Sequence, residues 1–138
     1  DVLQAAQALP GIFRPLRRHR SHAVGDGADA AEDEALLFLQ QQGLRLVCRN
    51  YRTPGRGGGE IDLIVRECDG TLVFVEVRAR ARDDFGGAGA SISALKRRRI
   101  VFAAKHFLRR YPKPPPCRFD AVLLQADSLI WLKAAFEE

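Results

Sequence analysis

The chain has 138 residues, of which 46% are hydrophobic and 28% charged, and its formal net charge is +5. This length corresponds to one domain of common size and is sufficient for a single hydrophobic core. No apolar run approaches the length of a membrane span, and the first residues lack the pattern of a signal peptide. The positive charge permits a polyanionic partner without proving one.

The cysteine pattern argues against two common kinds of site. Cys48, Cys68 and Cys117 are odd in number, widely separated and without a CxxC pair. Neither a zinc site nor a disulfide framework is therefore expected. A reduced, cytoplasmic protein is the simplest interpretation.

Residues 1–27 are the least domain-like part of the chain. The segment from Arg14 to Arg20 is a basic run, and Gly25-Asp26-Gly27 has the composition of a flexible joint. We interpret residues 1–27 as a mobile N-terminal arm that helps to contact phosphates. Residues 28–138 then form the domain proper.

A first helix is predicted from Asp29 to the glycine that ends it, Gly43. Asp29 as N-cap and Glu32 at the third helical position fit a capping box. The helical repeat predicts a buried stripe of Ala28, Ala35, Leu36 and Leu39. Glu32 falls inside this stripe, where a carboxylate is costly unless it is paired. Two interpretations stay open, because Glu32 either only closes the capping box or points toward a functional site.

Leu44 to Tyr51 predict a strand, which a glycine-rich segment from Thr53 to Gly59 follows. Arg52 and Arg56 make this region basic. A phosphate-cradling nucleotide loop precedes a helix, whereas this segment precedes a strand. We therefore expect a flexible basic loop near nucleic acid and no nucleotide site.

A β-hairpin is predicted from two segments, residues 59–65 and 71–78, which are rich in β-branched and apolar side chains. Cys68-Asp69-Gly70 between them has turn chemistry. We expect a three-residue loop in which Gly70 adopts the left-handed conformation and Glu67 pairs with Thr71.

The loop length decides which side chains face one another, because side chains alternate between the two faces of a strand. In the three-residue register Asp62 lies opposite Glu76, and Glu60 lies opposite Arg78. A two- or four-residue loop would place Asp62 and Glu76 on opposite faces. A surface hairpin with solvated acids and a cross-strand Glu-Arg pair stays open as the ordinary alternative.

Two facing carboxylates among valines and isoleucines would repel each other and raise one pKa unless a cation lies between them. Oxygen ligands in this arrangement suit a hard cation, Mg²⁺ or Mn²⁺.

A second helix is predicted from about Ser93 to Arg110, with a core stripe of Ile100, Ala103, Ala104 and Phe107. Lys96 lies on the side of that stripe, near the helix start. No acidic residue occurs between Phe85 and Phe119, so the helix carries one sign of charge. A solvated surface is the plain explanation, and a polyanion is the better one beside a carboxylate site. We expect nucleic-acid contacts from five arginines: Arg52, Arg56, Arg80, Arg97 and Arg98.

Prolines between positions 112 and 116 end this helix, and residues 119–125 and 129–132 predict two more strands. Asp120, near the start of the first of them, is expected to have a structural role in bonding nearby backbone. The order helix, three strands, helix, two strands predicts an α/β fold with a mixed central sheet of about five strands flanked by helices.

The segment Gly-Glu-Ile-Asp-Leu-Ile at 59–64, followed by Val-Phe-Val-Glu-Val-Arg-Ala-Arg at 73–80, resembles the core of the YraN-like proteins. That group is placed in the restriction-endonuclease-like superfamily, the PD-(D/E)XK nucleases. The resemblance covers residues 28–136 and includes Asn50-Tyr51-Arg52 upstream and Arg118-Phe119-Asp120 downstream. It implies a restriction-endonuclease-like core. The hairpin motif is specific in this combination and weak if either half stood alone.

The resemblance implies metal-dependent hydrolysis of phosphodiester bonds. Asp62, Glu76 and the main-chain carbonyl of Val77 would bind Mg²⁺, and Glu32 would assist.

The chain departs from the superfamily pattern at Arg78, where a lysine normally follows the glutamate by two positions. Arginine stays protonated and cannot act as a general base, although it can stabilise negative charge. Lys96 is the candidate for the role of that lysine.

We therefore expect a magnesium-dependent endonuclease that acts on nucleic acid, DNA first and branched or structured forms included. The alternative is a non-catalytic nucleic-acid-binding module that keeps the nuclease fold. Many relatives with this fold act as dimers, so a homodimer stays open.

Overall fold

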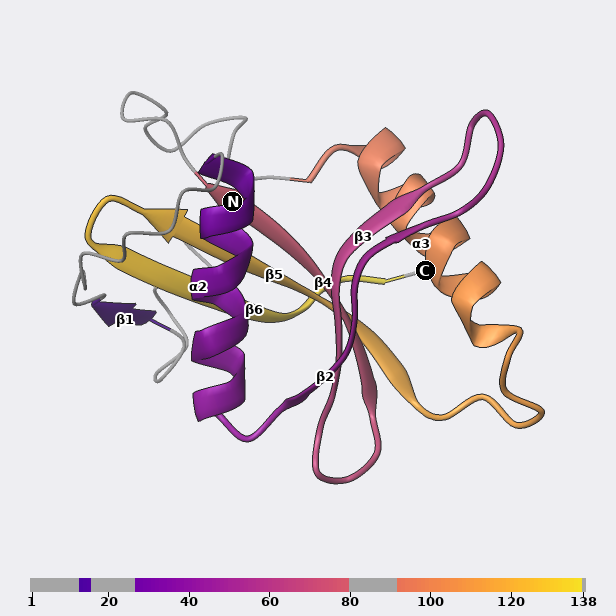
Figure 1. The fold of residues 1–138 in the computed structure, drawn as a ribbon, viewed down its shortest axis with the longest axis horizontal. Coiled ribbons are helices and arrows are strands. Elements are labelled where there is room, and N and C mark those ends of the chain that lie inside the picture. Colours follow the sequence, from indigo (N-terminus) through magenta and orange to yellow (C-terminus); the bar gives the residue numbers. More distant parts are fainter. Residues whose placement is uncertain (1–12, 16–26, 80–91, 138) are drawn as a thin grey trace.

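The computed structural model describes residues 13–15, 27–79 and 92–137, and it folds them into one sheet and two helices (Figure 1). The elements in chain order are β1 (Phe13–Pro15), α2 (Gly27–Gln41), β2 (Arg45–Arg52), β3 (Glu60–Arg66), β4 (Leu72–Ala79), α3 (Ala94–Leu108), β5 (Cys117–Gln125) and β6 (Ser128–Phe136).

The strands form a six-stranded mixed sheet in the order β1-β6-β5-β4-β3-β2. Only β4 and β5 run parallel, and α3 lies in the connection between them, as a parallel pair requires. The predicted α/β class and mixed sheet are confirmed, and β1 adds a short edge strand that pairs with β6. This strand falls within the predicted N-terminal arm, whose other residues up to position 26 lie outside the described part.

The two helices pack on opposite faces of the sheet and bury two apolar layers. In the α2 layer, Ala35, Phe38 and Leu39 pack against residues such as Val73 and Trp131. In the α3 layer, the predicted stripe of Ile100, Ala103, Ala104 and Phe107 is buried as expected. The predicted α2 stripe is confirmed at Ala35 and Leu39, with Leu36 partly buried, whereas the side chain of Ala28 lies outside the described residues.

The predicted N-cap of the first helix is wrong, because the helix begins before Asp29. Helix α2 already begins at Gly27, so Asp29 lies in its first turn and cannot be its N-cap. An aspartate is favourable at either place, because both expose it to the positive end of the helix dipole. The start of α3 was predicted correctly, since the Ser93 side chain accepts a hydrogen bond from the Lys96 amide at 3.1 Å.

The hairpin between β3 and β4 has the predicted three-residue loop. The Glu67 amide donates to the Thr71 carbonyl at 2.9 Å, and Gly70 has φ of +93°. The register pairs Leu63 with Val75 and Val65 with Val73. Continued by one step, this register places Asp62 opposite Glu76, as predicted.

Asp120 has the structural role expected for it. It lies fully buried where the pairing of β5 with β6 shifts register. Its carboxylate accepts hydrogen bonds from Ala134 N at 2.9 Å, Trp131 Nε1 at 3.0 Å and Arg118 Nε at 3.0 Å. The side chain thus supplies acceptors where the irregular strand pair leaves a backbone donor without its ladder partner.

Candidate active site

Asp62 on β3 and Glu76 on β4 form the centre of the candidate site. The two carboxyl groups are close enough to share a hydrogen bond. The Val77 amide donates to Asp62 Oδ2 at 2.8 Å, which fixes the orientation of that carboxylate. Glu76 is only 5% exposed, and its Oε2 is buried without a hydrogen-bond partner among the described residues.

Strand β3 changes face at Asp62. Ile61 and Leu63 would share a face in a regular strand, yet Ile61 packs in the α3 layer and Leu63 in the α2 layer. The residue opposite Asp62 in the β2–β3 register is Asn50, whose φ is +51°. This left-handed residue interrupts the alternation in β2 at the same level as Asp62.

The interruption brings Asp62 between the two helices. The charge of Asp62 raises the pKa of Glu32, on α2, while the charge of Lys96, on α3, lowers the pKa of Asp62. A regular strand would present its carboxylate to one layer only. Asp62 therefore belongs to a site that both helices help to build.

Glu32 lies buried on α2, with 7% of the residue exposed. The Nη2 atom of Arg49 lies 3.6 Å from its Oε2, and the Asn50 side chain is within hydrogen-bonding reach. Burial first and the Asp62 charge second raise the pKa of Glu32. Because Glu32 is buried and α2 begins at Gly27, a capping box with Asp29 does not explain its position.

Two cations approach Glu76 from different elements. Lys96 Nζ, on α3, lies 3.7 Å from Glu76 Oε1, and Arg78 Nε lies 3.9 Å from the same oxygen. Both distances are within the range of an ion pair and exceed that of a normal hydrogen bond. The structure thus brings together all five side chains that the sequence predicted for catalysis: Glu32, Asp62, Glu76, Arg78 and Lys96.

The carboxyl pair is electrostatically strained. Burial first and the Asp62 charge second raise the pKa of Glu76 from its ordinary value of 4.5 to about 8, against the opposing effect of Lys96. Burial also raises the pKa of Asp62. The pair therefore holds a proton at neutral pH, as two close carboxylates in an apolar environment do.

Four of the five arginines predicted to contact nucleic acid lie on the surface of the described structure. Arg52 pairs with Glu60 at 3.3 Å, and Arg56 is exposed in the loop between β2 and β3. Arg97 and Arg98 are exposed on the first turns of α3, with Arg97 Nε donating to the Ile92 carbonyl at 2.8 Å. Arg80 lies outside the described residues.

The loop between β2 and β3 is closed at its base. The Gly59 amide donates to Thr53 Oγ1 at 2.7 Å, and the Thr53 amide donates to the Gly59 carbonyl at 3.0 Å. A Cβ atom on Gly59 would lie 1.9 Å from the Arg99 carbonyl oxygen, so only glycine allows this approach to α3. The glycine fixes where the basic loop leaves the body of the domain.

The donor set fits a hard divalent cation of the kind that the resemblance implies. Among the described residues, no three His, Cys, Asp or Glu side chains form a ready metal cluster. However, Glu76 Oε2 and Glu32 Oε2 are buried oxygens that have no hydrogen-bond partner in the part of the chain that the structure describes. Mg²⁺ is commonly held by one or two carboxylates with water as its other ligands, which is what Asp62 and Glu76 can offer.

Sequence reasoning gave no site role to Arg49 or to Asn50, which contact Glu32 from β2, although Asn50 lies in a segment that carries the resemblance. Arg49 Nη1 also lies 2.7 Å from Asp33 Oδ1 and so ties β2 to α2. The available signal was the asparagine itself, since this residue is rare inside strands and tolerates the left-handed conformation.

Comparison with known proteins places these residues in a family. The model of the uncharacterised protein family UPF0102 matches residues 31–124, which include every site residue described above. A UPF0102 protein of Paracidovorax citrulli is 73% identical over 136 residues, which are 99% of this chain and 97% of the relative. A UPF0102 protein of Acidovorax sp. strain JS42 is 68% identical, over 78% of this chain and 82% of the relative.

In the described part of the chain, neither helix has the length and apolar character needed to cross a membrane. The family match extends from α2 into β5 and thus spans the hairpin, both helices and the carboxyl pair. The chain belongs to the UPF0102 family.

Proposed function

We propose that this chain is a metal-dependent nuclease that hydrolyses phosphodiester bonds in nucleic acid, with DNA, branched forms included, as the first substrate to test. The observation that carries the proposal is the buried Asp62–Glu76 pair. Its carboxyl groups lie within hydrogen-bonding reach, beside Lys96 and next to a helix without acidic residues. Such a pair costs stability, so a functional reason for keeping it is favoured.

Asp62, Glu76 and the main-chain carbonyl of Val77 would hold Mg²⁺ or Mn²⁺. When bound, the ion would polarise the phosphate and lower the pKa of a water molecule. The Val77 amide already holds Asp62 Oδ2 at 2.8 Å, so this oxygen is preoriented. Glu32, buried on α2, would orient water from the other side.

The two cations would have different tasks. Arg78 stays protonated and would stabilise negative charge that develops on the phosphate. Lys96 lies 3.7 Å from Glu76 and is 35% exposed, so its ammonium group can reach both the carboxylate and solvent. We assign to Lys96 the role that a lysine two positions after Glu76 would have in the PD-(D/E)XK nucleases.

Placement in that superfamily is part of the proposal. It is supported by the hairpin motif and by the order of α2, three antiparallel strands, α3 and two further strands. Exposed Arg52, Arg56, Arg97 and Arg98 would contact phosphates around the site, and Arg80 joins them by its position in the sequence. The cysteine pattern supports a cytoplasmic location.

Two observations favour a second candidate, a nucleic-acid-binding module without catalysis. Arg78 replaces the lysine, and the described residues offer no third protein carboxylate or imidazole in a ready metal cluster. Binding alone would need the positive surface and not the carboxyl pair.

Cleavage of labelled single-stranded, duplex and four-way-junction DNA in Mg²⁺, Mn²⁺ or EDTA separates the two candidates. Asp62→Asn is the test variant, and Asp127→Asn, on an exposed turn between β5 and β6, is the matched control. Metal-dependent cleavage lost only in Asp62→Asn supports the nuclease. Binding without cleavage by wild type and both variants would favour the binding module.

A further inference from the structure

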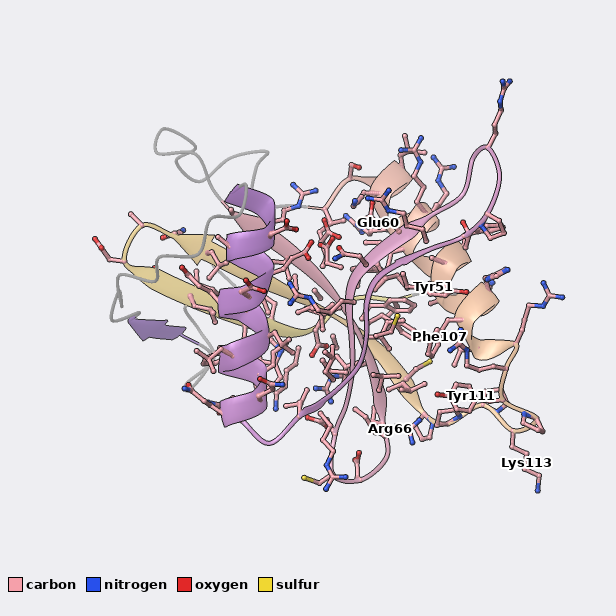
Figure 2. All side chains as sticks on the ribbon, viewed as in Figure 1. Tyr51, Glu60, Arg66, Phe107, Tyr111 and Lys113 are labelled. Carbon is pink, nitrogen blue, oxygen red and sulfur yellow. The ribbon has the colours of Figure 1, made fainter. Side chains whose placement is uncertain are left out.

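A cluster of aromatic rings lies along the last turns of α3, where the helix packs on β2 and β3. The Phe107 ring is 5.2 Å from the Tyr51 ring and 6.0 Å from the Tyr111 ring, measured between centroids. The Tyr51 hydroxyl hydrogen-bonds to His106 Nδ1. Figure 2 shows Tyr51, Phe107 and Tyr111 in succession on this side of the molecule, with Arg66 beside them.

These rings hold two arginines in place. The Arg110 guanidinium lies 3.8 Å above the centre of the Phe107 ring, and its Nε donates to the Phe107 carbonyl at 3.1 Å. Arg66 Nη2 donates to the Tyr111 hydroxyl at 3.1 Å, with its guanidinium 5.9 Å from the ring centre. Cation–π contacts and neutral acceptors order the side chains and leave their charges intact.

Arginines elsewhere in the described structure are paired differently. Arg118 lies 2.8 Å from Glu67 and 3.0 Å from Asp120, and Arg49 lies 2.7 Å from Asp33. In contrast, no described carboxylate lies within ion-pair distance of Arg66 or Arg110. Their charges are therefore ordered but not neutralised, which is the preparation that an anionic ligand would need.

The strand register adds a further cation at the same place. Arg45, exposed on β2, pairs directly with Arg66 on β3, and like charges directly opposite each other are destabilising. Arg66 Nε is also buried without a hydrogen-bond partner among the described residues. Lys113 is exposed two residues after Tyr111. An anion bound across these groups would offset both costs.

We propose that Arg45, Arg66, Arg110, Tyr111 and Lys113 form a second nucleic-acid contact, the aromatic–arginine surface, which binds phosphates of the strand outside the carboxyl site. This inference rests on the proposed function for the choice of ligand. Arg66 ends β3, four residues after Asp62, a rise of about 13 Å. That distance corresponds to about four phosphates along one strand of a duplex.

The geometry of the aromatic–arginine surface favours nucleic acid over a lipid membrane as its ligand. Its rings are already covered by one another and by guanidinium groups, and none of them is among the strongly exposed apolar side chains. Insertion into a lipid layer would need more apolar side chains than Leu46 and Val47, the two exposed ones that follow Arg45 on β2. Planar guanidinium groups in fixed positions instead suit phosphate oxygens.

The test measures binding of a labelled DNA strand and of an RNA strand of the same sequence by fluorescence anisotropy in EDTA, over a series of salt concentrations. Arg45→Gln and Arg110→Gln are compared with Lys133→Gln, which removes one exposed charge on β6. Each test variant is expected to bind about fivefold more weakly, and the slope of log affinity against log salt should fall by about one. Lys133→Gln should bind like wild type.

Arg110→Lys separates charge from packing, because it keeps the charge and loses the planar stack on Phe107. It should retain most of the affinity. If Arg110→Lys loses as much affinity as Arg110→Gln, packing and charge are not separated at this position. The affinity of Arg45→Gln then decides whether the surface binds nucleic acid, because Arg45 is exposed and packs on no ring in the described structure.

The inference is overturned if Arg45→Gln binds like wild type. It is equally overturned if wild type binds neither strand, or binds only vesicles of anionic phospholipid. Cleavage in Mg²⁺ is measured on the same proteins. Cleavage with unaltered affinity in the variants would refute the surface and leave the nuclease standing. Weakened affinity without any cleavage would refute the nuclease and leave the surface standing.

Discussion

Replacing Glu76 by glutamine should stabilise the protein, because it removes a buried carboxyl group whose pKa the folded structure raises. Glutamine keeps the shape of the protonated side chain. The folded-state pKa of about 8 lies above the ordinary value of 4.5, so the folded chain binds more protons between these limits. The contribution of Glu76 to the wild-type free energy of unfolding is therefore greatest below about pH 4.5, and it falls as the pH rises to about 8.

The size of the effect follows from the same two values. The difference between the two pKa values corresponds to a cost of about 5 kcal/mol for ionising Glu76 in the folded protein, at about 1.4 kcal/mol per pKa unit. This cost already includes the attraction of Lys96 and Arg78. Asp62 shares the titration with Glu76, so part of the cost survives the substitution. We expect Glu76→Gln to gain about 2 kcal/mol at pH 8, which raises Tm by several degrees in a chain of this length.

The assay is urea denaturation of wild type and variant from pH 5 to pH 9, without divalent metal. Wild type should lose stability across this range more steeply than Glu76→Gln. Glu34→Gln, at an exposed position of α2, is the matched control and should follow wild type. Identical pH dependence in wild type and Glu76→Gln would refute the reasoning, as would a lower stability of Glu76→Gln at pH 8.

Substitutions at three further positions test how the fold around the site is supported, each by urea denaturation at pH 7. Gly59→Ala should lose about 2 kcal/mol, because its methyl group would lie 1.9 Å from the Arg99 carbonyl oxygen; unchanged stability would show that α3 moves away freely. Asn50→Gly should be about 1 kcal/mol more stable than Asn50→Ala, since φ of +51° strains alanine only, and equal stabilities would contradict this. Asp120→Asn should lose about 3 kcal/mol by disturbing the three donors around a fully buried carboxylate, whereas a loss below about 1 kcal/mol would show that they find other partners.

Much of the fold could be predicted because local rules decide it. A three-residue loop ending in Gly70 sets the hairpin register, and the register alone brings Asp62 opposite Glu76. Helical periodicity likewise placed Lys96 on the buried side of α3, where its ammonium group reaches Glu76. In both cases one element or one turn contains all the information that is needed.

Other features depend on contacts between distant segments. The left-handed Asn50 is understood only with β3 beside it, because the change of face appears in Ile61 and Leu63. The sequence alone could not show whether Asp29 is the N-cap or a residue of the first helical turn, since an aspartate is favourable at both positions. The pairing of Arg45 with Arg66 needs the β2–β3 register, which a shift between Leu46 and Cys48 makes irregular.

Cleavage by Glu76→Gln tests the central claim most directly, because one substitution separates stability from chemistry. Wild type and Glu34→Gln should cut DNA in Mg²⁺ or Mn²⁺ and stop in EDTA. Glu76→Gln should be the more stable protein and should lose cleavage by at least about a hundredfold, which is about 3 kcal/mol of transition-state stabilisation. Cleavage by Glu76→Gln at the wild-type rate would contradict the claim that this buried carboxyl pair is kept for hydrolysis.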